Sequence, residues 1–424
     1  MATTAEIYAK QLAEKRADQL DVTECELIDV ANHDGENRLR QLVLELAVAN
    51  SVTYRSILNA LDGNADILPN QLDVLFETAL IELMRLGILQ NKYAEQVADW
   101  QKIQHLYPNH ESTASEKNCT PPDITRDTMT VYYPWRRQGS LQPILRQKQF
   151  NEVVYSRNSG IISQEAQQRL ARIKVLIVGA GVGGNIAKML AMAGVQNFVI
   201  VDAGTVDLHN LNRTSYAGVP DLGVDLATLV SREIKELNPY ATVEKHNALL
   251  SVDEGPPNMN DRGVSTVHFG DVVQGCEVLI EGVDNLFMKY LIQMSALRSG
   301  LVTLMPSDLG MGANLKIVAG EPFNGNLAMD QMMKQIGIIQ QAPPDQQYRL
   351  MTDLAREIIG EKNVPPHMLE AIKVAVENNF GFYPQTGVAA ALAASLVTEQ
   401  IIQFAELGKS TGAKDVTIDL RPLS

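Results

Sequence analysis

Apolar side chains follow two different patterns along the chain. Through residues 39–61 and 72–89 they recur at helical spacing, whereas from Lys174 onward they come in short, β-branched runs. The first pattern predicts helices, because residues three or four positions apart share one helix face. The second is typical of strands that are buried on both faces of a parallel sheet. The sequence therefore predicts an N-terminal helical part followed by a part with a different architecture.

Residues 1–128 are predicted to form a mainly helical domain that ends in a linker. An ordinary helical packing domain explains the pattern, and two short amphipathic helices also resemble a winged-helix or helix-turn-helix module. Residues 106–128 are polar and contain consecutive prolines, which predicts a linker or a long loop. The aromatic and basic run VYYPWRR at residues 131–137 is either a docking strand or an ordinary packed segment.

Residues 129–424 are predicted to form an α/β domain. KVLIVGA and NFVIVD have the composition of strands, and NIAKMLAMAGV between them has apolar residues at helical spacing. Such alternation predicts a doubly wound, Rossmann-like, mostly parallel sheet. Residues 326–380 break the rhythm with three helical patterns separated by prolines, which predicts a helical insertion that covers or shapes the site. Further candidate strands are residues 242–248, 278–283, 301–306, 314–320 and 416–420.

Composition and charge narrow the class of protein. The 424 residues are 45% hydrophobic and 20% charged, as in a soluble globular protein, and the length favours two domains. The formal net charge of -14 predicts an acidic surface. That surface argues against a nucleic-acid partner, which needs a basic footprint, and against an anionic membrane surface.

Cysteine usage and the N-terminus predict a cytoplasmic protein. The three cysteines, Cys25, Cys119 and Cys276, lie far apart and none belongs to a C-x-x-C pair, which argues against a thiolate zinc site. Their sparse, odd number suits a reducing compartment. MATTAEIYAKQLAEKRADQ lacks an apolar signal core. The longest small-apolar run, at residues 386–397, is too short to span a bilayer.

A glycine-rich turn follows the first strand of the α/β domain. Gly179, Gly181 and Gly184 form a Gly-x-Gly-x-x-Gly motif. The first glycine of such a motif permits a tight turn, the second lets backbone approach a phosphate, and the third lets helix and strand pack closely. Asp202 ends the next strand, where a carboxylate can accept hydrogen bonds from ribose hydroxyls. Together these features predict a site for an adenine nucleotide.

Two further loops carry side chains that suit a triphosphate. TVDLHNLNRTSY places Asn210 and Arg213 at the carboxyl edge of the sheet, where ligands bind in such folds. A guanidinium there can donate a pair of hydrogen bonds to phosphate oxygens. VLIEGVDN ends a third buried strand with Asp284, a natural anchor for Mg²⁺.

At these residues the chain resembles the ThiF/MoeB/HesA family, the ubiquitin-activating-enzyme-like adenylyltransferases. The resemblance runs from about Tyr155 to Leu420, and its motifs come in the order of the family. They are VVYSRNSGIISQEAQQRL, VGAGVGGN, VDAGTVDLHNLNR, DLG followed by LNP, GVDN and PQTGVAAALAASLVTEQII. Several motifs in order are far more specific than any one of them.

The resemblance implies an activity and a set of site residues. Family members use ATP and Mg²⁺ to adenylate a carboxylate, usually the C-terminus of a small protein or peptide. Arg157 in YSRN matches the arginine that such dimers insert into the neighbouring subunit's site, which implies a homodimer. The other implied roles are the nucleotide turn for Gly179, Gly181 and Gly184, the ribose for Asp202, the phosphates for Asn210 and Arg213, and Mg²⁺ for Asp284.

Several positions depart from the family's pattern. The essential lysine of the family falls at Leu226, and losing such a positive group typically costs about 10²–10³ in rate. The usual arginine after Asp-Asn is Lys289, which keeps a cation among the expected catalytic residues. Lys188 is another candidate replacement, although a solvated helix lysine explains it as well. The position two after Asp202, often acidic in the family, is Gly204.

The cysteines of many family members are also missing. No cysteine follows Cys276, so the thioester-forming cysteine is absent, and so are the paired zinc cysteines. Cys276 precedes an apolar strand and is expected to be buried and inert. Activation without transfer to an enzyme thiol is the form left open, as in microcin-type peptide-modifying enzymes and cyclic-threonylcarbamoyl-tRNA dehydratases. The acidic charge disfavours the tRNA substrate.

Three functions follow as hypotheses. The leading one is an ATP-dependent adenylyltransferase that activates a peptide or protein C-terminus, with the N-terminal domain recognising the substrate. Leu226 supports a second, a catalytically degenerate partner or scaffold subunit that binds nucleotide or protein without chemistry. The third is a nicotinamide-dependent oxidoreductase. It needs a proton-transfer group near the ring, whereas His209 beside Asn210 is better explained as a hydrogen-bonding loop residue.

Overall fold

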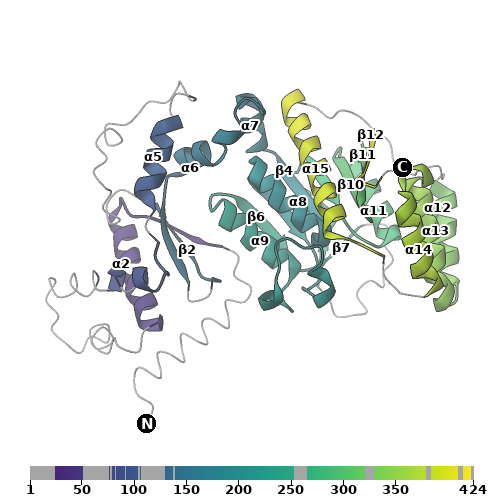
Figure 1. Cartoon of the computed structure of the whole chain (residues 1–424), viewed down its shortest axis with the longest axis horizontal. Coiled ribbons are helices and arrows are strands. Elements are labelled where there is room, and N and C mark those ends of the chain that lie inside the picture. The colour runs from purple at the N-terminus through teal and green to yellow at the C-terminus, as the bar shows by residue number, and fades with distance from the viewer. Residues whose placement is uncertain are drawn as a thin grey trace, which may run out of the picture. The chain divides into compact units, whose positions relative to one another are not determined.

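The protein divides into two compact units, Met1–Arg157 and Asn158–Ser424. The computed structural model (Figure 1) describes residues 24–50, 76, 79–81, 83–90, 92–103, 106, 129–136, 139–252, 265–319, 329–378, 383–408 and 414–421. Most of the predicted linker at residues 106–128 and the helical pattern at residues 51–75 lie outside these residues.

The first unit combines the predicted helices with a small antiparallel sheet. Strands β1 (Glu26–Asp29), β2 (Met129–Tyr133) and β3 (Ser140–Ile144) pair in the order β1-β2-β3. The predicted division at residues 128/129 falls inside this unit, because β2 and β3 hydrogen-bond to the same sheet as β1. VYYPWRR therefore begins in a central, packed strand.

Helices cover this sheet with their apolar positions. The predicted pattern at residues 39–61 is confirmed as far as helix α2 (His33–Asn50), which buries Leu39, Val43 and Leu46. Helical residues between 79 and 85 agree with the pattern at residues 72–89. Two further α-helices among the described residues of this unit are α5 (Tyr93–Ile103) and α6 (Gln147–Val154).

The second unit is built on a seven-stranded, mostly parallel sheet, as the sequence predicts. Its order is β12-β11-β10-β9-β4-β5-β6. The strands from β6 to β10 pair in parallel, and β11 and β12 add antiparallel pairs at one end. The bounds are β4 Lys174–Val178, β5 Asn197–Val201, β6 Thr242–His246, β9 Val278–Glu281, β10 Val302–Leu309, β11 Gly312–Val318 and β12 Lys414–Asp419.

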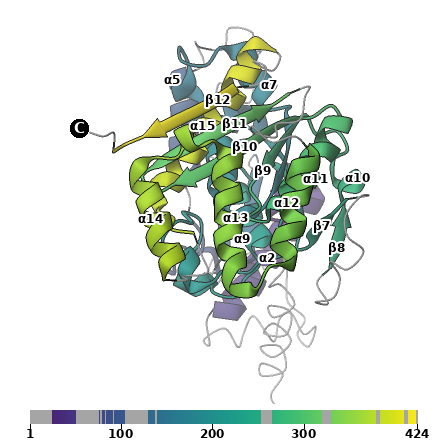
Figure 2. The same ribbon diagram turned by 90° about the vertical axis from the view of Figure 1, so that its right-hand side faces the viewer.

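Helices cover both faces of this sheet, which makes it doubly wound. One face packs on α8 (Ala180–Ala193), α9 (Leu226–Leu237) and α15 (Gly387–Leu407), and the other packs on α11 (Leu286–Arg298). The predicted insertion forms α12 (Met329–Gln341), α13 (Pro344–Ile359) and α14 (Pro366–Glu377). Figure 2 shows these three helices side by side. Smaller elements are α7 (Gln164–Leu170), α10 (Phe269–Val272) and the two-stranded sheet β7 (Leu249–Ser251) with β8 (Thr266–His268).

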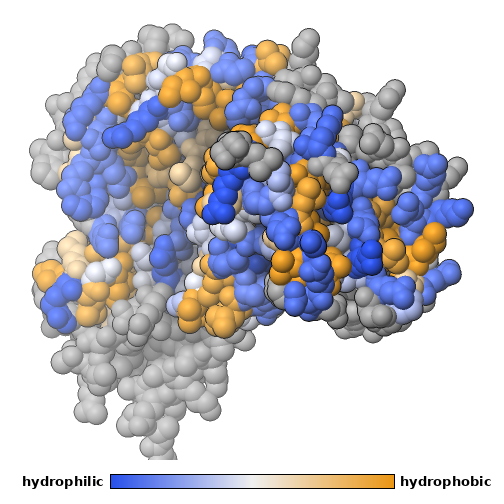
Figure 3. All heavy atoms as spheres, turned by 45° about the vertical axis from the view of Figure 1, so that its right-hand side comes forward, coloured by the Kyte–Doolittle hydropathy of each residue, from blue (hydrophilic) through white to orange (hydrophobic). Residues whose placement is uncertain are grey.

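Helix α15 is a core helix of the second unit. It is longer than the apolar run in the sequence, and by length and composition alone it could cross a membrane. Its alanine-rich face, which includes Ala390 and Ala394, is fully buried. It packs against α8, β10 and β11, so burial inside the unit explains its apolar composition. Figure 3 shows hydrophilic and hydrophobic residues interspersed over one face of the described surface.

Candidate functional site

A cavity of about 550 Å³ lies at the carboxyl edge of the second unit's parallel strands. Gly179 follows β4, Asp202 follows β5 and Asp284 lies just beyond β9, and all three line this cavity. The carboxyl ends of parallel strands share one edge, which is why residues far apart in the sequence meet there. The predicted site residues that line it are Gly179, Gly181, Asp202, Asn210, Arg213, Asp284 and Lys289.

The first two glycines of the motif form the turn between β4 and α8. Gly179 has a φ of 90°, and a Cβ there would lie 2.6 Å from the carbonyl oxygen of Gly282. Only glycine fits such a left-handed turn against a neighbouring backbone. Gly181 has nothing within 4 Å of the position of a Cβ, because it faces the open cavity. A ligand in the cavity can therefore approach the backbone closely at Gly181.

The third glycine of the motif has a different task from the one predicted. A Cβ on Gly184 would lie 2.3 Å from Cε1 of Tyr216 and 2.7 Å from Cγ2 of Val230. Gly184 therefore lets α8 approach the loop before α9 and α9 itself. The glycine that faces the strand is Gly183, where a Cβ would lie 2.8 Å from Cγ2 of Ile177 in β4. Gly184 is also absent from the described residues that line the cavity.

Asp202 is held by backbone donors at the end of β5. The N–H of Ala180 donates to its Oδ2 (2.6 Å), and the N–H of Gly204 donates to its Oδ1 (2.5 Å). Burial raises the pKa of Asp202, and these two hydrogen bonds oppose that rise because they favour the carboxylate. The carboxylate thus ties the end of β5 to the first residue of α8 at the wall of the cavity.

Asn210 shapes the loop that carries Arg213. Its side-chain oxygen accepts from the N–H of Asp207 (2.7 Å), and the Asp207 side chain caps the same short 3-10 helix, Leu208–Asn210. This reciprocal capping explains why Asn210 is buried although its residue type is polar. Asn210 therefore has a demonstrable structural task in addition to its place at the cavity.

Arg213 lies at the cavity with its guanidinium partly fixed. Its Nη1 donates to the carbonyl of His209 (2.9 Å) and to Oδ1 of Asn212 (3.2 Å). The loop is also held against the start of α15, since Nδ2 of Asn212 donates to the carbonyl of Gln385 (3.0 Å). A guanidinium oriented by its own loop loses less side-chain entropy when it binds an anion.

Leu226 lines the cavity as the first residue of α9 and is 7% exposed. It belongs to the core on that face of the sheet, and its N–H donates to the carbonyl of Gly204 (2.9 Å). A Cβ on Gly204 would lie 3.0 Å from Oδ1 of Asp202 and 3.4 Å from Cδ1 of Leu226. The leucine and the glycine, both departures from the family pattern, are therefore packed together beside Asp202.

Asp284 is an exposed carboxylate at the mouth of the cavity. The next residue, Asn285, caps α11 by accepting from the N–H groups of Phe287 (3.0 Å) and Met288 (3.1 Å). Asp284 therefore sits at a fixed position between the end of β9 and a capped helix start. Among the described residues, no group of three or more His, Cys, Asp or Glu side chains could hold a metal ion. A metal at Asp284 would need ligands from a bound substrate or from water.

Lys289 reaches the cavity but is already paired. Its Nζ lies 3.0 Å from Oε2 and 3.1 Å from Oε1 of Glu281, a residue with a fully buried side chain. Glu281 also accepts from the N–H of Val283 (2.8 Å). Burial raises the pKa of Glu281, and the Lys289 ammonium opposes that rise. Glu281 was not among the residues expected at the site, although a glutamate inside an otherwise apolar strand is a visible signal.

The other two candidate cations are not among the described residues that line the cavity. Lys188 forms an ion pair with Glu233 (2.5 Å) and donates to the carbonyl of Ser215 (3.2 Å), so its charge is already paired outside the described cavity walls. Arg157 is exposed and closes the first unit. Its proposed role in a neighbouring subunit stays a prediction.

The cavity is also lined by polar residues that were not expected at the site from the sequence. Lys316 lies within β11, is almost fully buried, and its Nζ is 3.8 Å from Oδ2 of Asp415. Burial lowers the pKa of Lys316 to about 8. Asp308 accepts from Nε2 of Gln385 (3.2 Å), and burial raises its pKa to about 6. The position of Lys316 inside the otherwise apolar run NLKIVAG was the feature of the sequence that could have indicated a special role for it.

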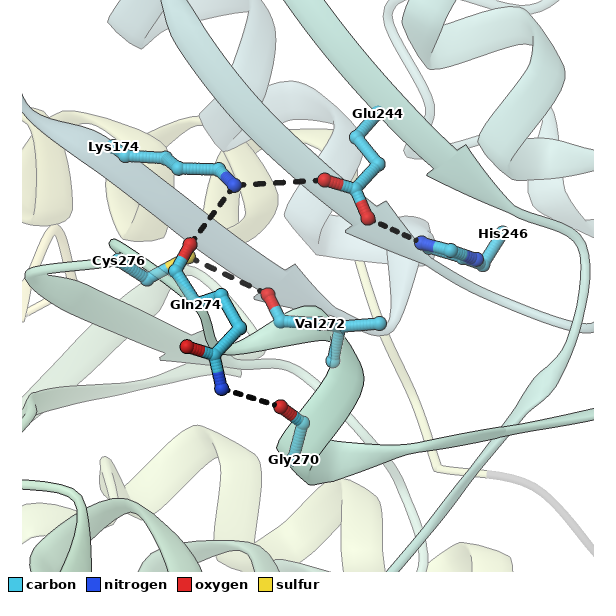
Figure 4. A network of polar contacts seen from close by, with 7 residues as sticks. All are labelled: Lys174, Glu244, His246, Gly270, Val272, Gln274 and Cys276. Atoms are coloured by element: carbon cyan, nitrogen blue, oxygen red, sulfur yellow. Dashed lines mark hydrogen bonds and ion pairs between the residues drawn. The ribbon is translucent and has the colours of Figure 1, made fainter.

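Cys276 is half-buried, and its surroundings keep the thiol protonated. Burial raises its pKa to about 11, and its Sγ donates to the carbonyl of Val272 (3.6 Å). Figure 4 shows Cys276 beside Lys174, whose Nζ lies 3.5 Å from Glu244. Because a thiolate is the reactive form, the raised pKa supports the expectation of an inert cysteine, although the residue is less buried than predicted.

Two relatives share part of the sequence. The "Uncharacterized protein MT1398" of Mycobacterium tuberculosis is 31% identical over 224 residues, which are 52% of this chain and 27% of that protein. The "Probable molybdopterin-synthase adenylyltransferase" of Porphyra purpurea is 30% identical over 137 residues, which are 32% of each chain. This chain thus spans about a quarter to a third of the length of these relatives.

The chain is also similar to a solved structure and to a family model. The crystal structure of E. coli MccB aligns with a TM-score of 0.44 and 13% identity, covering 91% of this chain and 83% of that chain. The ThiF family model matches residues 155–417. The matched segment contains β4 to β11, the glycine turn and every described wall of the cavity. Because the family model covers more than half of the chain, this protein belongs to the ThiF family.

Proposed function

We propose that this protein is an ATP- and Mg²⁺-dependent adenylyltransferase that activates the C-terminal carboxylate of a peptide or small protein. The observation that carries the proposal is the convergence of Asp202, Arg213 and Asp284, from three separate loops, on one cavity. Their chemistry suits ribose hydroxyls, phosphate oxygens and a divalent cation, respectively. Gly181 adds an open backbone approach at the N-terminus of α8, where an anion is favoured.

The reaction needs positioning and charge stabilisation rather than an enzyme nucleophile. A substrate carboxylate oxygen bonds to the α-phosphorus of ATP, the bond from that phosphorus to the bridging oxygen breaks, and pyrophosphate leaves. The product is an acyl-adenylate. Arg213 is a cation at the cavity, oriented by its own loop, that can stabilise the negative charge of the transferring phosphates. No cysteine lines the cavity among the described residues, which agrees with activation without an enzyme thioester.

Mg²⁺ fits the chemistry of Asp284. The carboxylate is exposed and lines the cavity, and hard oxygen ligands are those that Mg²⁺ prefers. When bound, the ion would neutralise charge on the phosphates of ATP. Asp284 would hold it, and the Asn285 cap keeps the backbone at Asp284 in place.

Two observations support the choice of substrate. One relative's name states that it adenylates a protein, molybdopterin synthase. The chain also has a separate N-terminal unit with its own core, for which we propose recognition of the peptide or small protein. We also propose that the protein is cytoplasmic. The family assignment favours adenylation over the nicotinamide-dependent alternative.

Pyrophosphate exchange tests the proposed function. Purified protein with ATP, Mg²⁺ and candidate peptides should incorporate labelled pyrophosphate into ATP only when a suitable carboxylate is present. The Asp284→Ala variant should lose exchange, whereas Asp271→Ala, an exposed acidic residue away from the cavity walls, should keep it. Normal exchange in Asp284→Ala would contradict the assigned role.

Leu226 favours a second candidate function, a ThiF-like partner subunit without catalysis. The cavity wall that would carry the family's lysine is apolar and packed against Gly204. Calorimetry with ATP and Mg²⁺ separates the two functions. No binding at millimolar ATP in the intact protein supports the partner subunit, and where ATP binds, pyrophosphate exchange decides between the enzyme and a subunit that binds nucleotide without chemistry.

A homodimer with Arg157 acting in the neighbouring site is part of the proposal. Two apolar side chains near the Arg213 loop, Leu208 and Val219, are 70% and 65% exposed, as expected of a surface that a second copy covers. Mixing inactive Arg157→Ala with inactive Asp284→Ala tests the arrangement. Restored exchange of up to about a quarter is expected, because half of the dimers are mixed and each has one intact site. No restoration in demonstrably mixed dimers would contradict it.

A further inference from the structure

We propose that Lys316 and Arg356 bind an acidic side chain of the substrate, close to the C-terminal carboxylate that is activated. This inference rests on the proposed function and adds a substrate class to it, a peptide or small protein with an acidic residue near its C-terminus. Lys316 comes from β11 and Arg356 from α13 of the helical insertion. Both line the same cavity as Arg213 and Asp284.

The strand register places Lys316 at the carboxyl edge of the sheet. Met305 lies opposite Lys316 in the antiparallel pair of β10 and β11. Leu304 lies opposite Ile280 in the parallel pair of β10 and β9. Lys316 is therefore level with Glu281, the last residue of β9. Side chains at one level of neighbouring strands point to the same face, which for Glu281 is the face of its ion pair with α11. Lys316 thus points to the side of the sheet that α11 covers.

Arg356 adds a second positive charge to the lining of the cavity. It lies four residues after Thr352, which also lines the cavity, so the two share one face of α13. Its Nη1 lies 3.6 Å from Oδ1 of Asp353, whose side chain is 56% exposed. An ion pair with an exposed carboxylate contributes little because water screens it. The charge of Arg356 therefore still acts on a ligand in the cavity.

Asp415 is the acidic neighbour of Lys316, and it is shared with other donors. Its Oδ2 lies 3.8 Å from Nζ of Lys316. The same carboxylate accepts from Nδ2 of Asn314 (2.5 Å) and from Nδ2 of Asn363 (2.7 Å), both at closer range. Burial lowers the pKa of Lys316 to about 8, although Asp415 opposes that change. A second carboxylate at hydrogen-bond distance would therefore stabilise the ammonium group further.

Asp308 also lines the cavity, and its negative charge has to be weighed against these cations. It is three residues from Met305 along β10, which places it on the opposite face of that strand. Its Oδ1 accepts from Nε2 of Gln385 (3.2 Å). Burial raises its pKa, and the charged groups that act on that pKa are Asp284 and Arg213. Asp308 therefore belongs to the surroundings of Arg213.

The order of the strands separates Lys316 from the expected nucleotide. In the order β11-β10-β9-β4-β5, Lys316 lies on one side of β9. Gly179 follows β4 and Asp202 follows β5 on the other side, and Asp284 lies just beyond β9 between them. ATP held by Gly179 and Asp202 therefore leaves the side of β10 and β11 for the other reactant, the substrate that carries the carboxylate.

The distance across the sheet indicates which group of the substrate meets Lys316. β11 is the second strand beyond β9, so Lys316 lies roughly 10 Å from the end of β9 that precedes Asp284. The reacting carboxylate is needed at the phosphates and cannot also contact Lys316. An extended chain spans about 3.3 Å per residue, so roughly one residue and a long side chain, or two residues and a short one, cover the distance. An acidic residue one or two positions before the C-terminal residue therefore fits.

Stable acyl-adenylate mimics test this inference without any chemical step. The probes are N-acetyl-glutamyl-alanyl sulfamoyl adenosine and its glutaminyl isostere, titrated against the full-length protein by calorimetry. A second pair carries two alanines after the glutamate or glutamine. In at least one pair the glutamyl compound should bind roughly 10–10²-fold more tightly, because it adds a charged hydrogen bond beside the apolar Met305, where water competes little. Equal affinities within both pairs would overturn the inference.

Matched variants separate charge recognition from a structural role. Lys316→Met and Arg356→Met should each reduce the preference to within about threefold and leave the affinity for the glutaminyl compound unchanged. Lys316→Gln is the alternative if methionine disturbs folding. Lys373→Met removes an exposed cation of α14 outside the described cavity walls and should keep the preference. Equal losses for both compounds in both Lys316 variants would overturn the inference, and so would an undiminished preference in them.

Two further measurements separate this inference from its alternatives. Lys316→Met should leave the affinity for ATP unchanged, because the phosphates are expected on the other side of β9. A loss of ATP affinity as large as the loss for the glutamyl compound would assign Lys316 to the phosphates and overturn the inference. A glutamyl preference without pyrophosphate exchange for any peptide would instead overturn the proposed function alone.

Discussion

Nζ of Lys289 lies 3.0 Å from Oε2 of Glu281, and this ion pair, in which Glu281 is fully buried and Lys289 is half-buried, joins β9 to α11 on either side of Asp284. Glu281 also accepts from the N–H of Val283, so the pair fixes both ends of the segment that carries Asp284. The charge of Lys289 is therefore committed to positioning the loop. That makes Lys289 a poor substitute for the family lysine that is missing at Leu226.

The ion pair predicts a non-additive effect on stability. Lys289→Met should lower the free energy of unfolding by about 3–5 kcal/mol, because it leaves the Glu281 carboxylate buried and unpaired. The double variant Glu281→Leu and Lys289→Met should recover most of this loss. Urea unfolding of the two variants and the wild type measures both effects. A double variant that is less stable than Lys289→Met would contradict the buried-charge explanation.

Alanine variants of Arg213 and Lys188 test which of these cations stabilises the phosphates in place of the family lysine that is missing at Leu226. Arg213→Ala should lower the rate of pyrophosphate exchange by about 10²–10³, the typical cost of losing one charge-stabilising donor. Lys188→Ala should leave the rate within a factor of about two, since Lys188 is paired with Glu233 outside the cavity walls. Steady-state exchange assays at saturating ATP decide the comparison. A large loss in Lys188→Ala with intact folding would return Lys188 to the site.

Alanine substitutions at two glycines of the motif should have different effects, one on folding and one on ATP binding. Gly179→Ala should impair folding, because Gly179 has a positive φ and its Cβ would lie 2.6 Å from a backbone oxygen. Gly181→Ala should fold normally, since its Cβ would meet open space, and should weaken ATP binding. Thermal melts and ATP titration of both variants make the test. Unchanged ATP affinity in Gly181→Ala would place the phosphates elsewhere.

Replacing Asp308 by asparagine should raise the free energy of unfolding by an amount that depends on pH. Burial raises its pKa to about 6, above its usual value of 3.8, so its stabilising contribution is complete below pH 3.8 and is lost as pH rises through 6. Asp308→Asn should therefore raise the free energy of unfolding by about 1–3 kcal/mol at pH 8 and change it little at pH 4. Urea titrations at the two pH values measure the difference. An equal effect at both values would mean that Asp308 does not titrate in this way.

Much of the α/β unit could be predicted from the sequence. The buried runs, such as residues 278–283, became strands because nearly every one of their side chains is covered on both faces of the sheet. The small sheet of the first unit was missed. Its strands β1 and β2 are far apart in the sequence, and short strands of that kind carry little periodic signal.

The sequence by itself determined which chemistry is available. The glycine spacing, Asp202, Arg213 and Asp284 are local signals, because each depends on the end of one strand and the loop after it. Leu226 was equally local, as a single departure from a known pattern. These residues defined the family, and the family model over residues 155–417 confirms it.

Only the tertiary structure decided how the charges are used. In the sequence, Lys289 and Lys188 were both candidate cations for the site. In the fold, Lys289 forms an ion pair with Glu281 and Lys188 forms one with Glu233. Lys316 lines the cavity from β11, a strand that carries none of the family motifs. The physical reason is that a charge is available or neutralised according to its neighbours in space, and packing of distant segments chooses those neighbours.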